Sequence, residues 1–222
     1  MVETTPKNRS TFFVDGFNLF HSVKEAEKQL PERQLKWLDV PRLCRSYLHL
    51  IGGNAELGGV HYFTAFADHL RDENPEKVQK HRAYVRALTA SGVTAHIGHF
   101  RRKKVWSHEL KRWVKAYEEK ETDVAIACEV LTLALEDRLD VAVIVTRDSD
   151  FAPVHRCFIS HFPGKRLLFA FPFARVSKEL KRLCPASFTI SKEAYAKHQL
   201  PESVRLPSGK LVTVPASWSV GG

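Results

Sequence analysis

The feature that most constrains this chain is the repeated alternation of short apolar runs with longer segments of helical pattern. The apolar runs are rich in branched and aromatic residues, and turn signals bound them, as is typical of strands. Five strands are predicted, over residues 11–14 (TFFV), 60–67 (VHYFTAFA), 93–98 (VTAHIG), 141–145 (VAVIV) and 166–170. Strands this apolar are expected where helices cover both faces of a parallel sheet. The alternation therefore predicts an α/β fold with a mainly parallel sheet of about five strands.

The segments between the strands carry helix signals. Helices are predicted over residues 17–29, 40–51, about 74–90, 123–136, about 151–160 and 176–183. Crossovers between parallel strands are right-handed and would place these helices on both faces of the sheet. The expected architecture is a three-layer α/β/α sandwich.

Two segments interrupt this rhythm. Residues 99–121 (HFRRKKVWSHELKRWVKAYEEKE) form an insertion that predicts a hairpin arm with its turn near Ser107–His108. The tail contains three prolines after residue 200 and the stretch VRLPSGKLVTV, which predicts a small hairpin. We therefore expect one domain over residues 1–198, with the arm at 99–121, and a C-terminal extension over 199–222.

Composition restricts the class of protein. No apolar run reaches the roughly 18–20 residues that a membrane-spanning helix needs, and residues 1–10 hold no apolar signal core. The cysteines Cys44, Cys128, Cys157 and Cys184 are widely spaced and form no CxxC pair. They are interpreted as small buried hydrophobes in a reducing compartment rather than as zinc ligands. The expected location is the cytoplasm.

The net charge of +9, from 34 Lys+Arg against 25 Asp+Glu, favours a polyanionic partner. The basic residues crowd into the predicted arm, where aromatic side chains capable of stacking on unpaired bases accompany them. The arm's candidate nucleic-acid-binding residues are Arg101, Arg102, Lys103, Lys104, Trp106, Lys111 and Arg112. Phe100, Trp113 and Tyr117 could also stack on bases, and His99 and His108 could touch RNA. The competing interpretation is a solvated hairpin whose aromatic residues pack on the domain.

Acidic residues follow two of the predicted strands directly. Asp15 ends the first strand, Asp148 and Asp150 end the fourth, and Asp123 begins a helix after the arm. Ligands of a parallel α/β sheet bind at the carboxyl ends of its strands, so these side chains could converge on one edge. Converging carboxylates repel one another without a cation, and they suit Mg²⁺ or Mn²⁺. Each residue alone also has a local explanation, because Asp15–Gly16 is a common turn and the other three could cap helices.

Three segments together resemble the signature blocks of NYN domains, including LabA-like proteins, which are similar to PIN-domain nucleases. These segments are VDGFN (14–18), EEKETDVAIACEVL (118–131) and VIVTRDSDFAPV (143–154). The resemblance covers roughly residues 11–191. It implies a PIN-like, Rossmannoid sandwich and metal-dependent cleavage of RNA.

Transferred to this chain, the resemblance implies catalytic roles for Asp15, Asn18, Asp123, Asp148 and Asp150. Asp15, Asp123 and Asp148 would hold the metal directly or through water. Asp150 would be a ligand or would orient one, and Asn18 would fix a ligand carboxylate or contact a phosphate. A further acid found on the helix of some relatives corresponds to Glu129, but six residues along a helix turn it well away from Asp123.

The chain departs from the family pattern in two places. Thr146–Arg147 replaces the usual small pair before the strand-four Asp, and Arg147 could either contact a phosphate or block the metal pocket. Some relatives carry cysteine pairs before the central helix that suggest zinc. None is present at that place in this sequence, so we expect no structural zinc.

The predicted function is a metal-dependent endoribonuclease, with a catalytically weak or inactive RNA-binding module as the alternative. A phosphatase with an Asp nucleophile would need a DxD motif, and the first block reads Asp15–Gly16–Phe17. The chain lacks the GxGxxG and GxxxxGK[ST] loops of dinucleotide-binding and P-loop proteins. The arm is long enough to reach a second copy, so the sequence also allows a homodimer.

Overall fold

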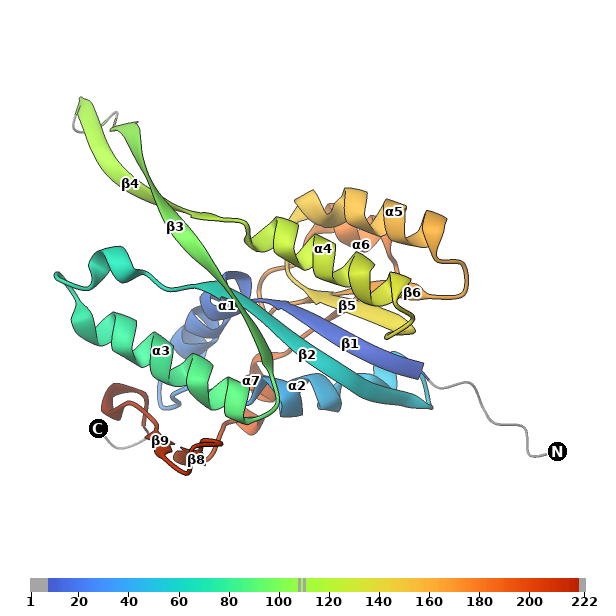
Figure 1. The fold of residues 1–222 in the computed structure, drawn as a ribbon, viewed down its shortest axis with the longest axis horizontal. Helices are drawn as coiled ribbons and strands as arrows, with labels where there is room; N and C mark the ends of the chain where they lie inside the picture. Colours follow the sequence, from blue (N-terminus) through green and yellow to red (C-terminus); the bar gives the residue numbers. More distant parts are fainter. Residues whose placement is uncertain (1–7, 108, 110, 220–222) are drawn as a thin grey trace.

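The structure, a computed structural model, describes residues 8–107, 109 and 111–219. Within these residues seven strands form one sheet, in the order β4-β3-β2-β1-β5-β6-β7 (Figure 1). The strands are β1 (Asn8–Asp15), β2 (Ala55–Ala65), β3 (Thr94–Ser107), β4 (Arg112–Lys120), β5 (Val141–Val145), β6 (Arg166–Phe171) and β7 (Phe188–Thr189). The five predicted strands are present, and β4 and β7 exceed the expected number. β4 belongs to the arm, and β7, at two residues, is too short to show a periodic pattern.

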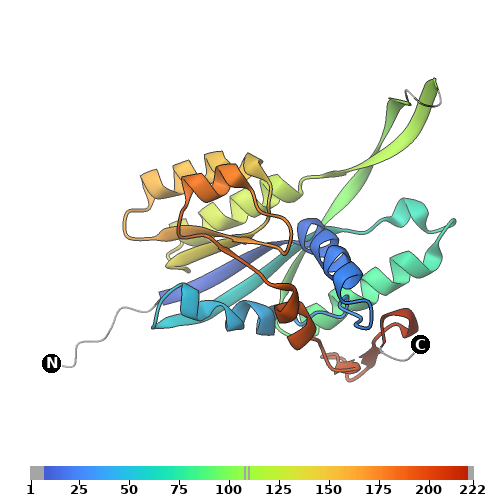
Figure 2. The ribbon, with the colours of Figure 1, turned by 180° about the vertical axis from the view of Figure 1, so that it is seen from behind.

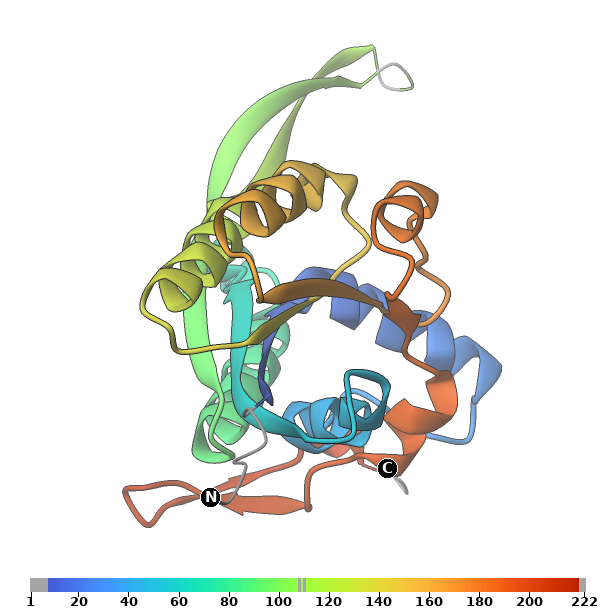
Figure 3. The ribbon, with the colours of Figure 1, turned by 90° about the vertical axis from the view of Figure 1, so that its right-hand side faces the viewer.

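Helices cover both faces of the sheet, which confirms the predicted α/β/α sandwich (Figures 1 and 3). One face carries α1 (Gly16–Gln29), α2 (Val40–Ser46), α3 (Pro75–Ala90) and α7 (Lys192–Lys197), and the other carries α4 (Thr122–Leu135), α5 (Ala152–His161) and α6 (Lys178–Leu183). The predicted helix over 40–51 is divided into α2 and the short turn η1 (Leu48–Leu50), and α7 was not predicted. None of the described helices is both long and apolar enough to cross a bilayer.

The arm is an extension of a core strand rather than a separate insertion. The first part of β3 runs parallel to β2, with His61–Ala65 opposite Thr94–Gly98. Its second part pairs antiparallel with β4, from His99↔Lys120 to Ser107↔Arg112, and the ribbon projects away from the body (Figures 1 and 3). The predicted hairpin is therefore present, and His108, placed at its turn, lies outside the described residues.

The C-terminal segment forms a second, two-stranded sheet of β8 (Ser203–Arg205) and β9 (Leu211–Thr213). It lies against α3, on the same side of the molecule as α1 and α7 (Figure 2). The division of the chain at residue 198 stays a prediction.

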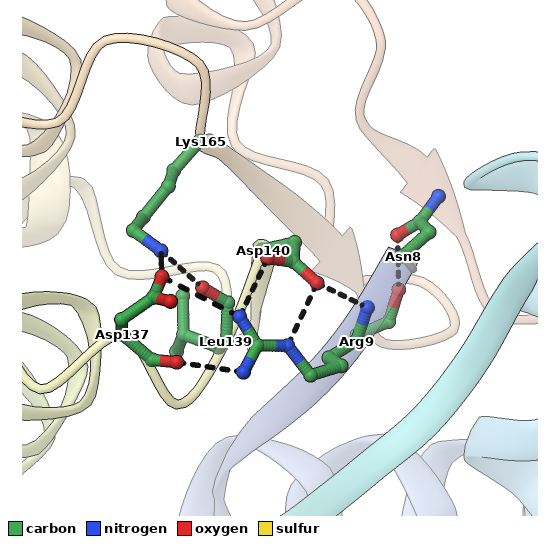
Figure 4. A network of polar contacts seen from close by, with 7 residues as sticks. Asn8, Arg9, Asp137, Leu139, Asp140 and Lys165 are labelled. Carbon is green, nitrogen blue, oxygen red and sulfur yellow. Dashed lines mark hydrogen bonds and ion pairs between the residues drawn. The ribbon is translucent and has the colours of Figure 1, made fainter. Parts of the chain in front are cut away.

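The opposite end of the sheet from the acidic residues is held by an ionic network (Figure 4). Arg9 binds Asp140 through two nitrogens, at 2.9 Å from Nε to Oδ2 and 2.8 Å from Nη2 to Oδ1. These hydrogen bonds with Arg9 lower the pKa of Asp140 to about 2. A two-point guanidinium–carboxylate pair is among the stronger polar contacts of proteins. It joins the first residues of β1 to the residue before β5, so the network aligns the two strands whose other ends carry the acids.

The cysteines correct one expectation. Cys44 and Cys184 are buried, as predicted, but Cys128 and Cys157 are exposed. Both exposed residues lie on α4 or α5, where apolar sequence surrounds them but their own positions face outward. An apolar composition does not reveal which side of a helix a single residue occupies.

Candidate active site

Asp15 ends β1 and caps α1 at once. Its Oδ1 accepts from the backbone N–H of Asn18 at 3.0 Å, and its Oδ2 accepts from the Asn18 side chain and, at 3.1 Å, from the Thr146 hydroxyl. Asp15 is only 4% exposed, and this burial raises its pKa despite the hydrogen bonds that favour the carboxylate. The Asp15–Gly16 pair is therefore a strand end joined directly to a helix start, not the loop that its composition indicates.

Gly16 is required by a close approach between α1 and β2. A Cβ at this position would lie 2.6 Å from the carbonyl oxygen of Phe63 and 2.7 Å from the ring of Tyr62. Such distances are far inside van der Waals contact, so only glycine lets the first turn of α1 sit on the sheet. This contact fixes the direction in which Asp15 and Asn18 face.

Thr146 links Asp15 to the acids that follow β5. β1 and β5 are parallel neighbours, with Val14 opposite Val145. The fully buried Thr146 hydroxyl donates to Asp15 and accepts from the backbone N–H of Asp148 at 3.1 Å. Asp148 in turn accepts from the backbone N–H of Asp150 at 3.0 Å and caps the short turn η3 (Ser149–Phe151). The residue that departs from the family pattern thus holds two of the predicted metal ligands in place.

Asp123 brings a further carboxylate to this edge from the first turn of α4. Its pKa is raised to about 6, first by partial loss of solvent and then by the negative charges of Asp15, Asp148 and Asp150. The other three acids predicted from the sequence therefore lie close enough to Asp123 to act on its charge. Asp148 is half-buried, whereas Asp123 and Asp150 have exposed surface, so the group is open to solvent on one side.

Glu119, near the end of β4, joins the group and was missed by the sequence analysis. Burial raises its pKa to about 7, and the charges of Asp15 and Asp123 add to that rise against the hydrogen bond from Thr122. The signal available in the sequence was its place four residues before Asp123, inside the block that resembles NYN domains. The predicted hairpin does not by itself place Glu119 at this edge, because its position depends on the register of β4 against β3.

The oxygen ligands of this group are of the chemical type that a hard divalent cation prefers, but within the described residues no three of its carboxylates bring ligand oxygens within 4.8 Å of one another. Three of its members, Asp15, Asp123 and Glu119, have raised pKa values, chiefly because burial disfavours their charged forms. Mg²⁺ and Mn²⁺ prefer carboxylate and water oxygens, and either ion would relieve the repulsion. Asp15, Asp123 and Asp148 are the residues that could hold it.

Two arginines stand beside the acids. Arg147 follows β5 and is exposed, and Arg175 follows β6. Burial lowers the pKa of Arg175, the neighbouring Arg147 lowers it further, and Asp15 acts in the opposite direction. Arg175 was also missed, although the rule that ligands bind beyond the carboxyl ends of parallel strands applies to β6 as it does to β1 and β5.

The register of the arm divides its side chains between two faces, because directly opposed residues of a ladder share a face. The face that begins at the acidic group carries Phe100, Glu119, Arg102, Tyr117, Lys104, Lys115, Trp106 and Trp113. The other face carries Arg101, Glu118, Lys103, Ala116, Val105, Val114 and Arg112. There Lys103 pairs with Glu118 at 3.0 Å. The basic residues predicted as one group thus lie on two sides, and Lys111 lies between the strands at the tip.

The aromatic residues of the arm also fall into two groups. At its base, the Tyr117 ring stacks on His69 at 3.8 Å between centroids, and Phe100 contacts His69 and Phe17. Towards its tip, Trp106 and Trp113 form a cross-strand pair at 5.8 Å and are 41% and 65% exposed. Phe100 and Tyr117 therefore contact the body, although Tyr117 is as exposed as Trp106, and Trp113 is the most exposed of the arm's aromatic residues.

Glu129 lies apart from the acidic group, as its position on the helix predicts. Its Oε1 is 3.3 Å from His61 Nδ1, and His61 Nδ1 is 3.1 Å from His96 Nε2. Burial lowers the pKa of His61 to about 4, with a smaller contribution from His96. These three residues form a second polar cluster beneath α4, which the sequence analysis did not foresee.

Comparisons with known proteins agree with the fold. A solved structure of a protein of unknown function from Vibrio parahaemolyticus is similar, with a TM-score of 0.56 and 15% sequence identity over 90% of this chain and 100% of that chain. Among curated proteins none matches the chain. The family model of the NYN domain matches residues 9–196, which include every carboxylate of the acidic group. NYN domains have a PIN-like fold and are generally nucleases that use divalent metals. The chain belongs to the NYN domain family.

Proposed function

We propose that this protein is a metal-dependent endoribonuclease whose active site is the acidic group of Asp15, Asp123, Asp148, Asp150 and Glu119. The observation that supports the proposal most directly is the buried Thr146 hydroxyl, which donates to Asp15 and accepts from the backbone N–H of Asp148 where β1 and β5 end side by side. Burial raises the pKa of the nearby Asp123, and the charges of Asp15, Asp148 and Asp150 raise it further. Carboxylates are brought together against their repulsion where a cation or a proton-transfer role compensates. Family membership favours the cation and phosphodiester hydrolysis.

In this proposal Asp15, Asp123 and Asp148 hold Mg²⁺ or Mn²⁺, and Asp150 orients Asp148 or joins it. The bound ion supplies activation of a water and stabilisation of charge on the phosphoryl oxygens. Asn18 and Thr146 keep the Asp15 carboxylate in one orientation through the bonds already described. Preorganised ligands of this kind determine both metal affinity and rate, because their rearrangement would otherwise cost free energy in each turnover.

The arm is the proposed RNA-binding surface, and the face that carries Glu119 is its substrate side. Arg102, Lys104 and Lys115 on that face are exposed and lie between the acidic group and the Trp106–Trp113 pair. Lysine and arginine neutralise phosphates, and exposed tryptophans stack on unpaired bases. Arg147 and Arg175, at the sheet edge, are the proposed contacts to the phosphates next to the cleaved bond.

Cleavage assays test the proposal directly. Purified protein is incubated with single-stranded RNA, structured RNA and single-stranded DNA of matched sequence, in Mg²⁺, Mn²⁺ or EDTA. The Asp15→Asn/Asp148→Asn variant is compared with Asp72→Asn/Glu202→Gln, which removes two exposed carboxylates elsewhere. We expect internal cleavage of RNA that needs a divalent ion, survives in the control variant and is lost in the site variant.

The alternative function is RNA binding without catalytic activity, and evidence for it would overturn the proposed nuclease activity. It would be established if the wild type and both variants left every RNA intact in either metal but bound it equally. Preferential cleavage of DNA would instead refute the assignment of RNA as the substrate. The proposed place of action is the cytoplasm, in accord with an RNA substrate.

A further inference from the structure

The second polar cluster joins three elements of the fold. His61 lies on β2 and His96 on β3, on the same face of these neighbouring strands, and Glu129 reaches them from α4. The His61 side chain is 11% exposed and the Glu129 side chain 28% exposed, so the cluster is enclosed on the sheet side and reachable from solvent beside the helix. One potential ligand atom from each residue lies within 4.8 Å of the other two.

A single nitrogen of His61 faces both of the other residues in this cluster. A neutral imidazole nitrogen either carries one proton or offers one lone pair, in a single direction within the ring plane. His61 Nδ1 nevertheless faces both His96 Nε2 at 3.1 Å and Glu129 Oε1 at 3.3 Å. If it carries a proton, that one proton must be shared between His96 Nε2 and Glu129 Oε1 in a three-centre hydrogen bond. If it carries none, its lone pair can point to a shared cation together with the lone pairs of the other two atoms. A single central cation would satisfy all three atoms.

We propose that His61, His96 and Glu129 bind a zinc ion that fastens α4 to β2 and β3. Ligands about 2.0–2.1 Å from a tetrahedral zinc are separated by ~3.3 Å, close to the observed 3.1 and 3.3 Å. Two imidazoles and a carboxylate are a zinc ligand set, and water completes it through the exposed side of Glu129. The nitrogen ligands disfavour Mg²⁺, so this site is chemically distinct from the all-oxygen acidic group.

The proposed site does not depend on the nuclease proposal. Glu129 lies six residues after Asp123 on the same helix, so an ion at Glu129 would restrain the element that carries Asp123. The expectation of no structural zinc rested on the absence of cysteine pairs before α4. Histidines from two adjacent strands provide a different route to a zinc site, and the proposal replaces that expectation.

Metal content and cobalt spectroscopy test this site. Untagged protein in the Asp15→Asn/Asp148→Asn background, which disables the acidic group, is equilibrated with zinc, desalted and analysed for metal. The comparison includes His96→Ala, Glu129→Gln and, as the control, His161→Ala, which removes an exposed histidine beside the Cys157 thiol. We expect about one zinc per chain in the parent and the control. Zinc affinity should fall by at least about 10–100-fold in the other two variants.

Two further readouts keep the test decisive. Co²⁺ substituted for zinc should give visible absorption bands in the parent that are lost in Glu129→Gln, and zinc should raise the melting temperature of the parent and control only. If His96→Ala does not fold, the zinc content of Glu129→Gln alone tests the site, because glutamine preserves the shape of the glutamate side chain. Equal zinc in parent, His96→Ala and Glu129→Gln would overturn the site, as would loss of zinc in His161→Ala alone. Stoichiometric iron or manganese in place of zinc would overturn the assignment of the metal.

Discussion

Replacement of Glu119 by glutamine should stabilise the metal-free protein at alkaline pH while it impairs metal binding. The Glu119 carboxyl is half-buried, and its pKa is raised from an ordinary 4.5 to about 7, chiefly by burial and then by Asp15 and Asp123. Glutamine keeps the shape and an oxygen that can accept from the Thr122 hydroxyl, but it carries no charge. The substitution therefore removes the repulsion without opening a cavity.

The magnitude and its pH dependence follow from linkage. The difference between 4.5 and about 7 corresponds to about 3 kcal/mol at about 1.36 kcal/mol per pKa unit. Solvent screens a carboxyl that is only partly enclosed, so we expect about 1–2 kcal/mol of this to be measurable. Below pH 4.5 the carboxyl is protonated in the folded and unfolded chains alike, and glutamine confers no advantage. As pH rises, the unfolded chain ionises first, so wild-type stability falls until pH is above about 7, where the advantage of glutamine is complete.

Urea unfolding at about pH 3.5, below the unfolded pKa, and at pH 8, both in EDTA, measures this effect. Glu118→Gln is the matched control, because Glu118 is adjacent but lies on the other face of the arm, where hydrogen bonds from Lys120 and Lys103 lower its pKa. It should show no gain at pH 8. Titration with Mg²⁺ should stabilise the wild type more than Glu119→Gln. A stability difference for Glu119→Gln that is the same at both pH values, or a loss of stability at pH 8, would refute the electrostatic reasoning.

Three other substitutions test separate parts of the structure. Gly16→Ala should lower the free energy of unfolding by about 1–3 kcal/mol in urea, because the alanine Cβ would collide with the Phe63 carbonyl. The general preference of alanine for helices does not compensate for this collision. An unchanged or raised stability would contradict the prediction. Thr146→Val should lower the free energy of unfolding by about 1–2 kcal/mol, because it removes two buried hydrogen bonds. It should also weaken Mg²⁺ binding measured by calorimetry. Unchanged Mg²⁺ affinity would argue against the orienting role of Thr146. Arg102→Ala should reduce the slope of log affinity for RNA against log salt concentration by about 0.7–0.9. Arg101→Ala, on the opposite face of the arm, should leave this slope nearly unchanged. Equal effects of the two substitutions would refute the assignment of a substrate face.

Much of the fold and part of the candidate site could be read from local pattern. The run 141–145 is apolar at every position, and this is sufficient to predict a strand buried on both faces. Asp15 and Asp148 follow two such strands, and the carboxyl ends of parallel strands share one edge of a sheet. Their proximity therefore needed no knowledge of side-chain packing. The rotation of Glu129 away from Asp123 was likewise determined by the helical repeat alone.

Tertiary structure decided what depends on pairing between distant segments. Glu119 reaches Asp15 because β4 returns along β3 in one particular register, and a shift of one residue would turn it to the face that Glu118 occupies. The contact of His61 with His96 and Glu129 needs β2, β3 and α4 to meet, across 35 and 68 residues of chain. Local sequence determines which elements form and where they end, because backbone preferences and periodicity are local. It does not determine which side chains meet across elements, because strand register and helix packing are properties of the whole fold.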